Sequence, residues 1–190
     1  MPPWYLPLLL LVVFWWLAEA PLRKNRRQSM RPSADDRSTI WVNTVLGSVG
    51  FVSSLGLMPW ARTVPSLRLG SWIAWGGLVV AAGGIALRRW SLDTLGRFHT
   101  GTLQVQADQE VVERGPYRLL RHPSYLGGDI ALLGVGVTTG SWLTALLMVL
   151  PFVAAHLWRI PIEERMMERA FGDRWRTYSR RTRRMIPYLW

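Results

Sequence analysis

Long apolar stretches alternate with short polar ones along this chain, and the apolar stretches have the length of membrane-spanning helices. Residues 4–18, 40–61 and 69–87 contain no charged side chain. A hydrocarbon core needs about 20 apolar residues per helix, and the flanking residues bring the first stretch to this length. The pattern predicts three transmembrane helices in this half of the chain.

A fourth apolar block runs from residue 126 to residue 158. As one helix it would be about 50 Å long at a rise of 1.5 Å per residue, which is too long for a bilayer. A hairpin of two helices that turns near residues 138–141 fits better. We therefore expect an all-α integral membrane protein with about five transmembrane helices, three in an N-terminal region (residues 1–87) and two in a C-terminal region (residues 88–190).

The positive charges are distributed very unevenly between the loops. The 190 residues include 23 Lys and Arg against 12 Asp and Glu, and only Arg62 and Arg68 fall in the predicted external loop. The other 21 cations fall on the opposite side in the five-helix topology. Because cations favour the cytoplasmic side, we expect a multi-pass membrane protein with its N-terminus outside and its C-terminus in the cytoplasm. This distribution argues against nucleic acid, the other common partner of basic proteins.

Two features of composition narrow the possible chemistry. The chain has no cysteine, which excludes disulfides, thiolate metal sites and a cysteine nucleophile. Its three histidines, His99, His122 and His156, are far apart in sequence and have no partner at the spacing of a metal site, so we expect no bound metal.

Small residues recur in the predicted spans, where they indicate close helix packing in lipid. The glycines concerned are Gly47, Gly50, Gly76, Gly77, Gly83 and Gly84.

The residues most suited to chemistry lie in two predicted cytoplasmic segments, 88–125 and 159–190. His122 precedes Pro123, which disfavours a helical backbone at the histidine, so we expect the chain to bend at the membrane border. The Tyr and Arg side chains around this point also suit a simple interfacial belt.

The second segment places two ionisable residues where the fifth predicted span ends. Arg159 and Glu163 are four residues apart, a spacing that would place them on one face across the end of the span. Ionisable groups at this depth are functional candidates, although a weak surface ion pair is the plainer alternative. Pro161 predicts the first turn of a separate helix, and Gly172 with Asp173 predicts a helix end followed by a new start.

The other polar residues of the C-terminal region have plainer interpretations. We expect His156 to be a hydrogen-bonded packing residue, and Asp129 to reach the interface or to pair with a cytoplasmic arginine. The arginines between residues 174 and 184 are expected to bind lipid head groups. A solvated helix face is expected for Glu164, Arg165, Glu168 and Arg169.

Two motifs carry a resemblance to a known family. Gly-Pro-Tyr at 115–117 followed by Arg-His-Pro-Ser-Tyr-Leu-Gly at 121–127 resembles the isoprenylcysteine carboxyl methyltransferases, which share this motif with membrane phospholipid methyltransferases. The similarity covers about 45% of the chain, from residue 103 to residue 187. Its C-terminal part rests on Glu163-Glu164, Met167, Phe171-Gly172, Trp175, Tyr178 and Ile186-Pro187.

The resemblance implies methyl transfer from S-adenosylmethionine to a lipophilic acceptor at the cytoplasmic membrane border. The implied acceptor is the carboxylate of an isoprenylcysteine-like, prenylated substrate, and Arg159 is the implied catalytic residue that holds it. The implied cofactor-binding residues are Gln106, Gln109, Glu110, Val111, Val112, Tyr117, His122, Pro123, Ser124, Tyr125 and Glu163.

Two other functions remain open at this point. The C-terminal pattern is also similar to that of sterol reductases, which predicts an NADPH-dependent membrane reductase. A membrane protein without enzymatic activity, whose basic tail binds anionic lipids, accounts for the arginines alone. The expected partners are a lipophilic or prenylated small-molecule substrate and membrane lipids.

Overall fold

The computed structural model describes residues 36–99, 105–106 and 108–186. Five helices make up most of this part: α2 (Asp36–Ala61), α3 (Ser71–Leu95), α4 (Pro123–Thr138), α5 (Trp142–Phe171) and α6 (Asp173–Arg181). Three short 3-10 turns, η2 (Pro65–Leu67), η3 (Gly96–Phe98) and η4 (Gly115–Arg118), lie in the connections. The described ranges contain no strand beyond two isolated bridges, which confirms the all-α prediction.

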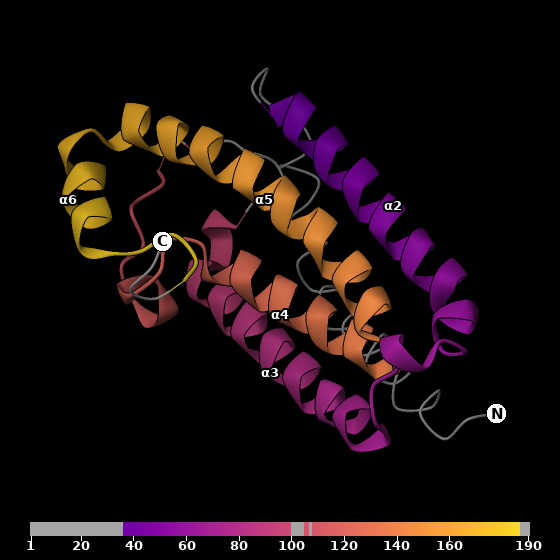
Figure 1. The fold of residues 1–190 in the computed structure, drawn as a ribbon. Coiled ribbons are helices and arrows are strands. Elements are labelled where there is room, and N and C mark those ends of the chain that lie inside the picture. The colour runs from indigo at the N-terminus through magenta and orange to yellow at the C-terminus, as the bar shows by residue number, and fades with distance from the viewer. Residues whose placement is uncertain (1–35, 100–104, 107, 187–190) are drawn as a thin grey trace.

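The four long helices pack in an order that differs from their order in the sequence. Helix α2 packs on α5, α5 on α4, and α4 on α3. Consequently α2 and α3, which follow each other along the chain, lie on opposite sides of the α4–α5 hairpin (Figure 1). This order brings residues of α2, α4 and α5 together at one end of the bundle. We refer to this end, where α3 ends, α4 begins and α6 lies, as the α6 end.

Exposed tryptophans mark the two edges of the membrane-spanning part. Counted along α2, α3 and α5, the two outermost tryptophans of each helix are about 24 to 29 Å apart at 1.5 Å per residue, close to the thickness of a hydrocarbon core. Tryptophan side chains favour membrane–water interfaces. The residues concerned, each at least 42% exposed, are Trp41 and Trp60 of α2, Trp72 and Trp90 of α3, and Trp142 and Trp158 of α5. With three described helices long and apolar enough to cross a membrane, the chain is an integral membrane protein, and the charged part of α5 follows Trp158.

Most of the predicted spans correspond to observed helices. The stretches 40–61 and 69–87 lie in α2 and α3, and the block 126–158 forms a hairpin whose turn lies at residues 139–141. Of these helices, α2, α3 and α5 are long and apolar enough to cross a membrane, while α4 has only 16 residues. The first predicted span, 4–18, lies outside the described residues, so the number of five spans remains a prediction. The predicted boundary at residues 87 and 88 falls inside α3.

Helix α5 corrects one prediction and confirms another. It runs without interruption from Trp142 to Phe171, so Pro161 does not begin a separate helix. The proline removes one backbone hydrogen bond, and the helix continues because its packing against α2, α4 and α6 holds both halves. The predicted stop is correct. Gly172 has a φ of 53°, a left-handed conformation that favours glycine, and α6 begins at Asp173.

Close helix packing is confirmed for most of the predicted glycines. A side chain at Gly77 or Gly84 of α3 would meet the backbone of α4, and one at Gly47 or Gly50 of α2 would meet α5. The prediction is wrong for Gly76 and Gly83, because no atom of the described residues lies within 4 Å of where a Cβ would be. These two glycines face away from the neighbouring helix, so the sequence pattern identified the helices but not the contacting face.

Candidate functional site

The segment before α4 places a histidine at the entrance to the helix. η4 begins at Gly115, whose φ is 55°, and leads through Tyr117 to His122. His122 has a non-helical backbone (φ −124°, ψ 50°), and Pro123 occupies the first turn of α4, as the sequence predicts. Tyr125 follows within the first turn. The α6 end of α4 therefore carries an imidazole and a phenol close together.

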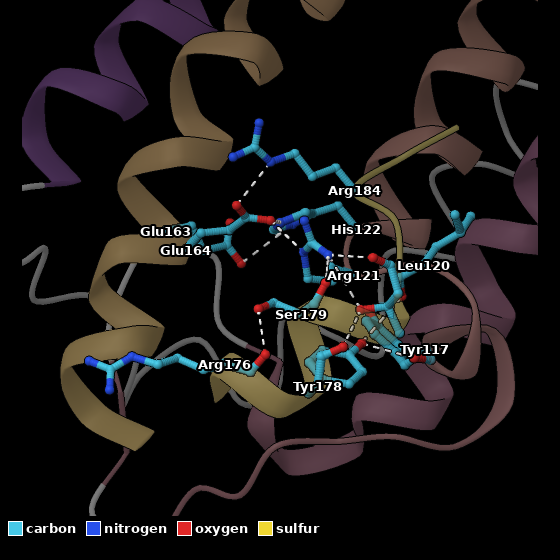
Figure 2. Close-up of polar contacts among 11 residues, drawn as sticks. Tyr117, Leu120, Arg121, His122, Glu163, Glu164, Arg176, Tyr178, Ser179 and Arg184 are labelled. Carbon is cyan, nitrogen blue, oxygen red and sulfur yellow. Dashed lines mark hydrogen bonds and ion pairs between the residues drawn. The ribbon is translucent and has the colours of Figure 1, made fainter. Parts of the chain in front are cut away.

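The chain after α6 holds this segment in place. The backbone N–H of Arg121 donates to Arg183 O at 2.7 Å, and that of His122 donates to Arg184 O at 2.9 Å. The Tyr178 hydroxyl donates to Tyr117 O at 2.9 Å, as Figure 2 shows. Residues 182–186, which we name the strap, thus fix the backbone on which His122 sits. The pKa of Tyr178 is raised by burial, so its hydroxyl remains a donor.

The four residues that the sequence singles out most strongly come together on α4 and α5. The Tyr125 hydroxyl donates to Glu163 Oε2 at 2.8 Å and accepts from Arg159 Nε at 3.0 Å. His122 Nδ1 lies 4.0 Å from Glu163 Oε1. Arg159 is only 8% exposed, and its Nη1 donates to Thr39 Oγ1 of α2 at 3.0 Å. The tyrosine therefore links the arginine and the glutamate that were predicted to share a helix face.

Two buried polar atoms at the site have no hydrogen bond within the described residues. His122 Nε2 lies 3.5 Å from Glu164 Oε1, but without the alignment of a hydrogen bond. The buried Tyr117 hydroxyl is close to the Ser124 side chain and likewise forms no well-aligned bond. Burial raises the pKa of Tyr117, which keeps this hydroxyl protonated. Buried polar groups in proteins are nearly always satisfied, so both atoms are suited to a ligand.

The solvated helix face predicted for Glu164 is wrong, because this side chain is largely buried. Its side chain is 13% exposed and accepts from Arg121 Nε at 2.6 Å and from Arg184 Nε at 2.9 Å (Figure 2). Burial opposes its ionisation, but the contacts with His122 and the Arg121 charge outweigh burial and lower its pKa to about 2. Adjacent residues on a helix point about 100° apart, so Glu163 faces α4 while Glu164 faces the strap. The other three residues expected on that face, Arg165, Glu168 and Arg169, are exposed.

Two further residues adjoin the site from the membrane side. His156 Nδ1 lies 3.0 Å from Asp129 Oδ1 and 3.1 Å from Oδ2, and the second contact has hydrogen-bond geometry. This confirms His156 as a hydrogen-bonded packing residue. The expectation for Asp129 is wrong, because its partner is this histidine rather than an arginine or the interface. The His156 ring stacks on Tyr125, with centroids 4.5 Å apart.

The remaining predicted cofactor residues lie around this centre. Gln106 and Gln109 bond to each other, and Gln106 Nε2 donates to Arg97 O at 2.9 Å. Val111 is buried against Trp175 and Tyr178, Val112 is half-buried, and Glu110 is exposed. Pro123 is buried, and Ser124 O accepts from Arg88 Nη1 at 3.2 Å. Among the described residues, no hydrogen bond or ion pair joins Gln106, Gln109 or Glu110 to His122 or Glu163.

The arginines predicted to bind lipid head groups have varied surroundings. Arg176 pairs with Glu168 and Asp173, Arg181 with Glu113, and Arg184 with Glu164. The other three arginines of this stretch, Arg174, Arg180 and Arg183, are exposed. The patch is therefore partly engaged in internal ion pairs, and its lipid binding stays a prediction.

Comparison with known proteins supports the resemblance seen in the sequence. The family model described as phospholipid methyltransferase matches residues 72–174, more than half of the chain. A protein-S-isoprenylcysteine O-methyltransferase B of Arabidopsis thaliana is 28% identical over 127 residues, which cover 66% of this chain and 64% of that protein. A cobalt-zinc-cadmium resistance protein of Cupriavidus metallidurans is 32% identical over 52% of this chain and 46% of its own length.

A solved structure shows the same fold. The eukaryotic intramembrane Ras methyltransferase, an isoprenylcysteine carboxyl methyltransferase, matches with a TM-score of 0.60 and 24% identity over 80% of this chain and 53% of its own. The chain thus spans about half to two thirds of the length of these relatives. The described residues place no three His, Asp or Glu side chains where they would hold a metal ion.

Proposed function

Because the chain belongs to the phospholipid methyltransferase family, we propose that it transfers a methyl group from S-adenosylmethionine to a lipophilic acceptor at the membrane border. The proposed acceptor is the carboxylate of an isoprenylcysteine-like substrate. The observation that carries the proposal is the junction of His122, Tyr125, Arg159 and Glu163 just beyond the membrane edge marked by Trp158. The sterol-reductase alternative receives no support from the comparisons.

The residues at this junction fit the polar end of the cofactor. When bound, S-adenosylmethionine supplies an electrophilic methyl group on a sulfonium. The Glu163 carboxylate suits the cofactor's ammonium, and the unsatisfied Tyr117 hydroxyl suits its carboxylate, while His122, whose Nε2 lies 3.5 Å from Glu164 Oε1, borders the same site. Tyr125 takes part in this site through its hydroxyl, because its ring is stacked against His122 and His156. We propose that residues 106 and 109–112, with Pro123 and Ser124, line the rest of the cofactor site.

Arg159 is suited to hold the acceptor. Its guanidinium is buried and is fixed by Thr39 and Tyr125, so little conformational entropy is lost when it binds a carboxylate. A charge-assisted hydrogen bond then orients the nucleophile. The burial of His122 and Arg159 keeps water away, which favours a reaction in which opposite charges cancel. A carboxylate nucleophile needs no general base.

The orientation in the membrane is also part of the proposal. We place the α6 end on the cytoplasmic side, because the described cations cluster there and Arg62 and Arg68 lie at the opposite end. The N-terminus then lies outside and the C-terminus inside. The site faces the compartment in which a soluble, charged methyl donor would be supplied.

Cofactor binding is the first test. Saturable binding of radiolabelled S-adenosylmethionine to the detergent-solubilised protein is expected, and Glu163→Gln or His122→Ala should abolish it. The matched control is Glu168→Gln, which removes an exposed carboxylate from the same helix and should leave binding unchanged. Absence of saturable binding in the unmodified protein, in detergent and in lipid, would overturn the proposal. A thermal shift with NADPH in place of S-adenosylmethionine would favour the reductase.

The acceptor is tested with a labelled methyl donor. A synthetic S-prenylcysteine with a free carboxylate should be methylated, whereas its carboxamide should not. The product of carboxylate methylation is an ester, which mild base hydrolyses with release of labelled methanol, while an N-methylated amine survives this treatment. Base-stable label in a lipid extract would therefore identify an amine acceptor and contradict the carboxylate.

A further inference from the structure

A buried polar pair lies directly on the membrane side of the proposed site and has no part in the chemistry above. Asp129 of α4 is 5% exposed and His156 of α5 is 8% exposed, and their side chains contact each other at 3.0 to 3.1 Å. Ionisable groups within membrane helices are costly and are usually retained for a functional reason. An apolar pair of similar size would fill the same space without this desolvation cost.

Asp129 and His156 each lie on the same helix as a residue of the proposed site and close to it in sequence. Asp129 follows Tyr125 by four residues on α4, and His156 precedes Arg159 by three residues on α5, so each polar partner lies one helical turn from a site residue. The His156 ring is 4.5 Å from the Tyr125 ring and nearly parallel to it, with 11° between the planes. The His122 ring is parallel to Tyr125 as well, at 5.6 Å. Stacking therefore couples the buried pair to the centre of the site.

We propose that Asp129 and His156 are positioning residues that set the plane of the Tyr125 ring, and through its hydroxyl the places of Arg159 and Glu163. A carboxylate that accepts from one imidazole nitrogen fixes the tautomer and the orientation of that ring. The fixed imidazole plane in turn fixes the stacked phenol. Since the Tyr125 hydroxyl bonds to both charged residues, a rotation of the ring displaces both at once.

This inference rests on the proposed methyl transfer, and it predicts effects of different size on kcat and on cofactor binding. Misplacement of reacting groups by about 1 Å costs on the order of a hundredfold in rate. The Glu163 carboxylate, proposed above to bind the cofactor's ammonium, moves with the ring, whereas the Tyr117 hydroxyl, proposed to bind its carboxylate, has no hydrogen bond to Tyr125. Loss of the pair should consequently weaken cofactor binding as well as lower kcat, with the larger effect on kcat because Arg159 is displaced too.

The test uses a repacked variant, because removal of one partner alone leaves the other buried and unpaired and risks misfolding. Asp129→Leu combined with His156→Phe keeps the volume and an aromatic ring but removes the hydrogen bond. We expect it to fold, to bind S-adenosylmethionine no more than about tenfold more weakly than the unmodified protein, and to lose kcat on the order of a hundredfold. The control is Thr144→Val, which removes a buried hydrogen bond at the far end of α5 and should leave kcat unchanged.

A second measurement does not depend on activity. The protein is labelled with ¹³C-tyrosine, and the Tyr125 resonance is assigned by its loss in Tyr125→Phe. This resonance should shift in Asp129→Asn, although no hydrogen bond joins residues 125 and 129. It should not shift in the control, Thr144→Val. Unchanged kcat in the repacked variant, or an unmoved Tyr125 resonance, overturns the positioning role. Failure of the unmodified protein to bind the cofactor or transfer methyl groups overturns the proposed function instead, and the resonance then decides the positioning role by itself.

Discussion

Tyr125 on α4 donates its hydroxyl hydrogen to Glu163 on α5, across an oxygen–oxygen distance of 2.8 Å. The same oxygen accepts from Arg159, so one phenol connects a cation and an anion that are four residues apart. An arginine and a glutamate at this spacing usually form a weak surface pair. Here a single hydroxyl oxygen fixes the positions of the two charged groups relative to each other.

Replacement of this hydroxyl should affect both the site and the stability of the fold. Tyr125→Phe keeps the ring stacking but leaves the buried Arg159 and the half-buried Glu163 without their shared partner. We expect the free energy of unfolding to fall by about 1 to 3 kcal/mol, the usual consequence of leaving buried polar groups unsatisfied, together with a large loss of kcat. Thermal unfolding and methyl transfer in the same detergent measure the two effects. Unchanged activity would show that the bridge has no role in the site.

Thr39 should matter for the acceptor and not for the cofactor. Its hydroxyl accepts from Arg159 Nη1, and it is the described contribution of α2 to the site. Thr39→Val should raise KM for the acceptor and lower kcat/KM about tenfold, equivalent to about 1.4 kcal/mol, without changing S-adenosylmethionine binding. Thr39→Ser restores the hydroxyl and should recover most of the loss. A loss that serine does not restore would indicate packing, not hydrogen bonding.

The Glu164 carboxylate should make stability depend on acidic pH. Its pKa is about 2 in the folded protein against about 4.5 in the unfolded chain, so the folded state favours the ionised form. The resulting stabilisation is fully present above pH 4.5 and is lost progressively as the pH falls towards 2. The melting temperature of Glu164→Gln should therefore be lower than that of the unmodified protein at pH 7, and the difference should shrink below pH 4.5. Glu168→Gln, an exposed counterpart on the same helix, should show no such trend.

Two neighbouring glycines of α3 should respond oppositely to alanine. A Cβ at Gly84 would meet the backbone of Ala131 on α4, so Gly84→Ala should push the helices apart and destabilise the protein by about 1 to 3 kcal/mol. A Cβ at Gly83 meets nothing within 4 Å, and alanine there should stabilise the helix by up to about 1 kcal/mol. Thermal unfolding of the two variants measures the contrast, and equal melting temperatures would contradict the α3–α4 interface described above.

The sequence predicted the helices better than the contacts between them. The apolar stretches and the turn at residues 139–141 define α2, α3 and the α4–α5 hairpin, because the length of an apolar run is read directly. Which face of a membrane helix is buried is not readable in the same way, since lipid and protein interior are both apolar. For this reason Gly76 and Gly83 were grouped with the buried glycines.

The sequence indicates only part of the candidate site, because contacts between distant segments cannot be read from it. His122, Tyr125, Arg159 and Glu163 follow from motifs that lie next to each other in sequence or within one helix turn. The roles of Thr39, Asp129 and Glu164 depend on the packing order α2–α5–α4–α3 and on the return of the strap, which join residues up to 120 positions apart. A signal for the Asp129–His156 pair did exist, since both are ionisable side chains within apolar spans.

The strap has a consequence for biosynthesis. Backbone bonds from residues 183 and 184 hold Arg121 and His122, so the imidazole is secured only after the ribosome has translated the segment beyond α6. A chain that stopped within the strap would therefore contain every membrane helix described here but would lack the backbone carbonyls that hold Arg121 and His122.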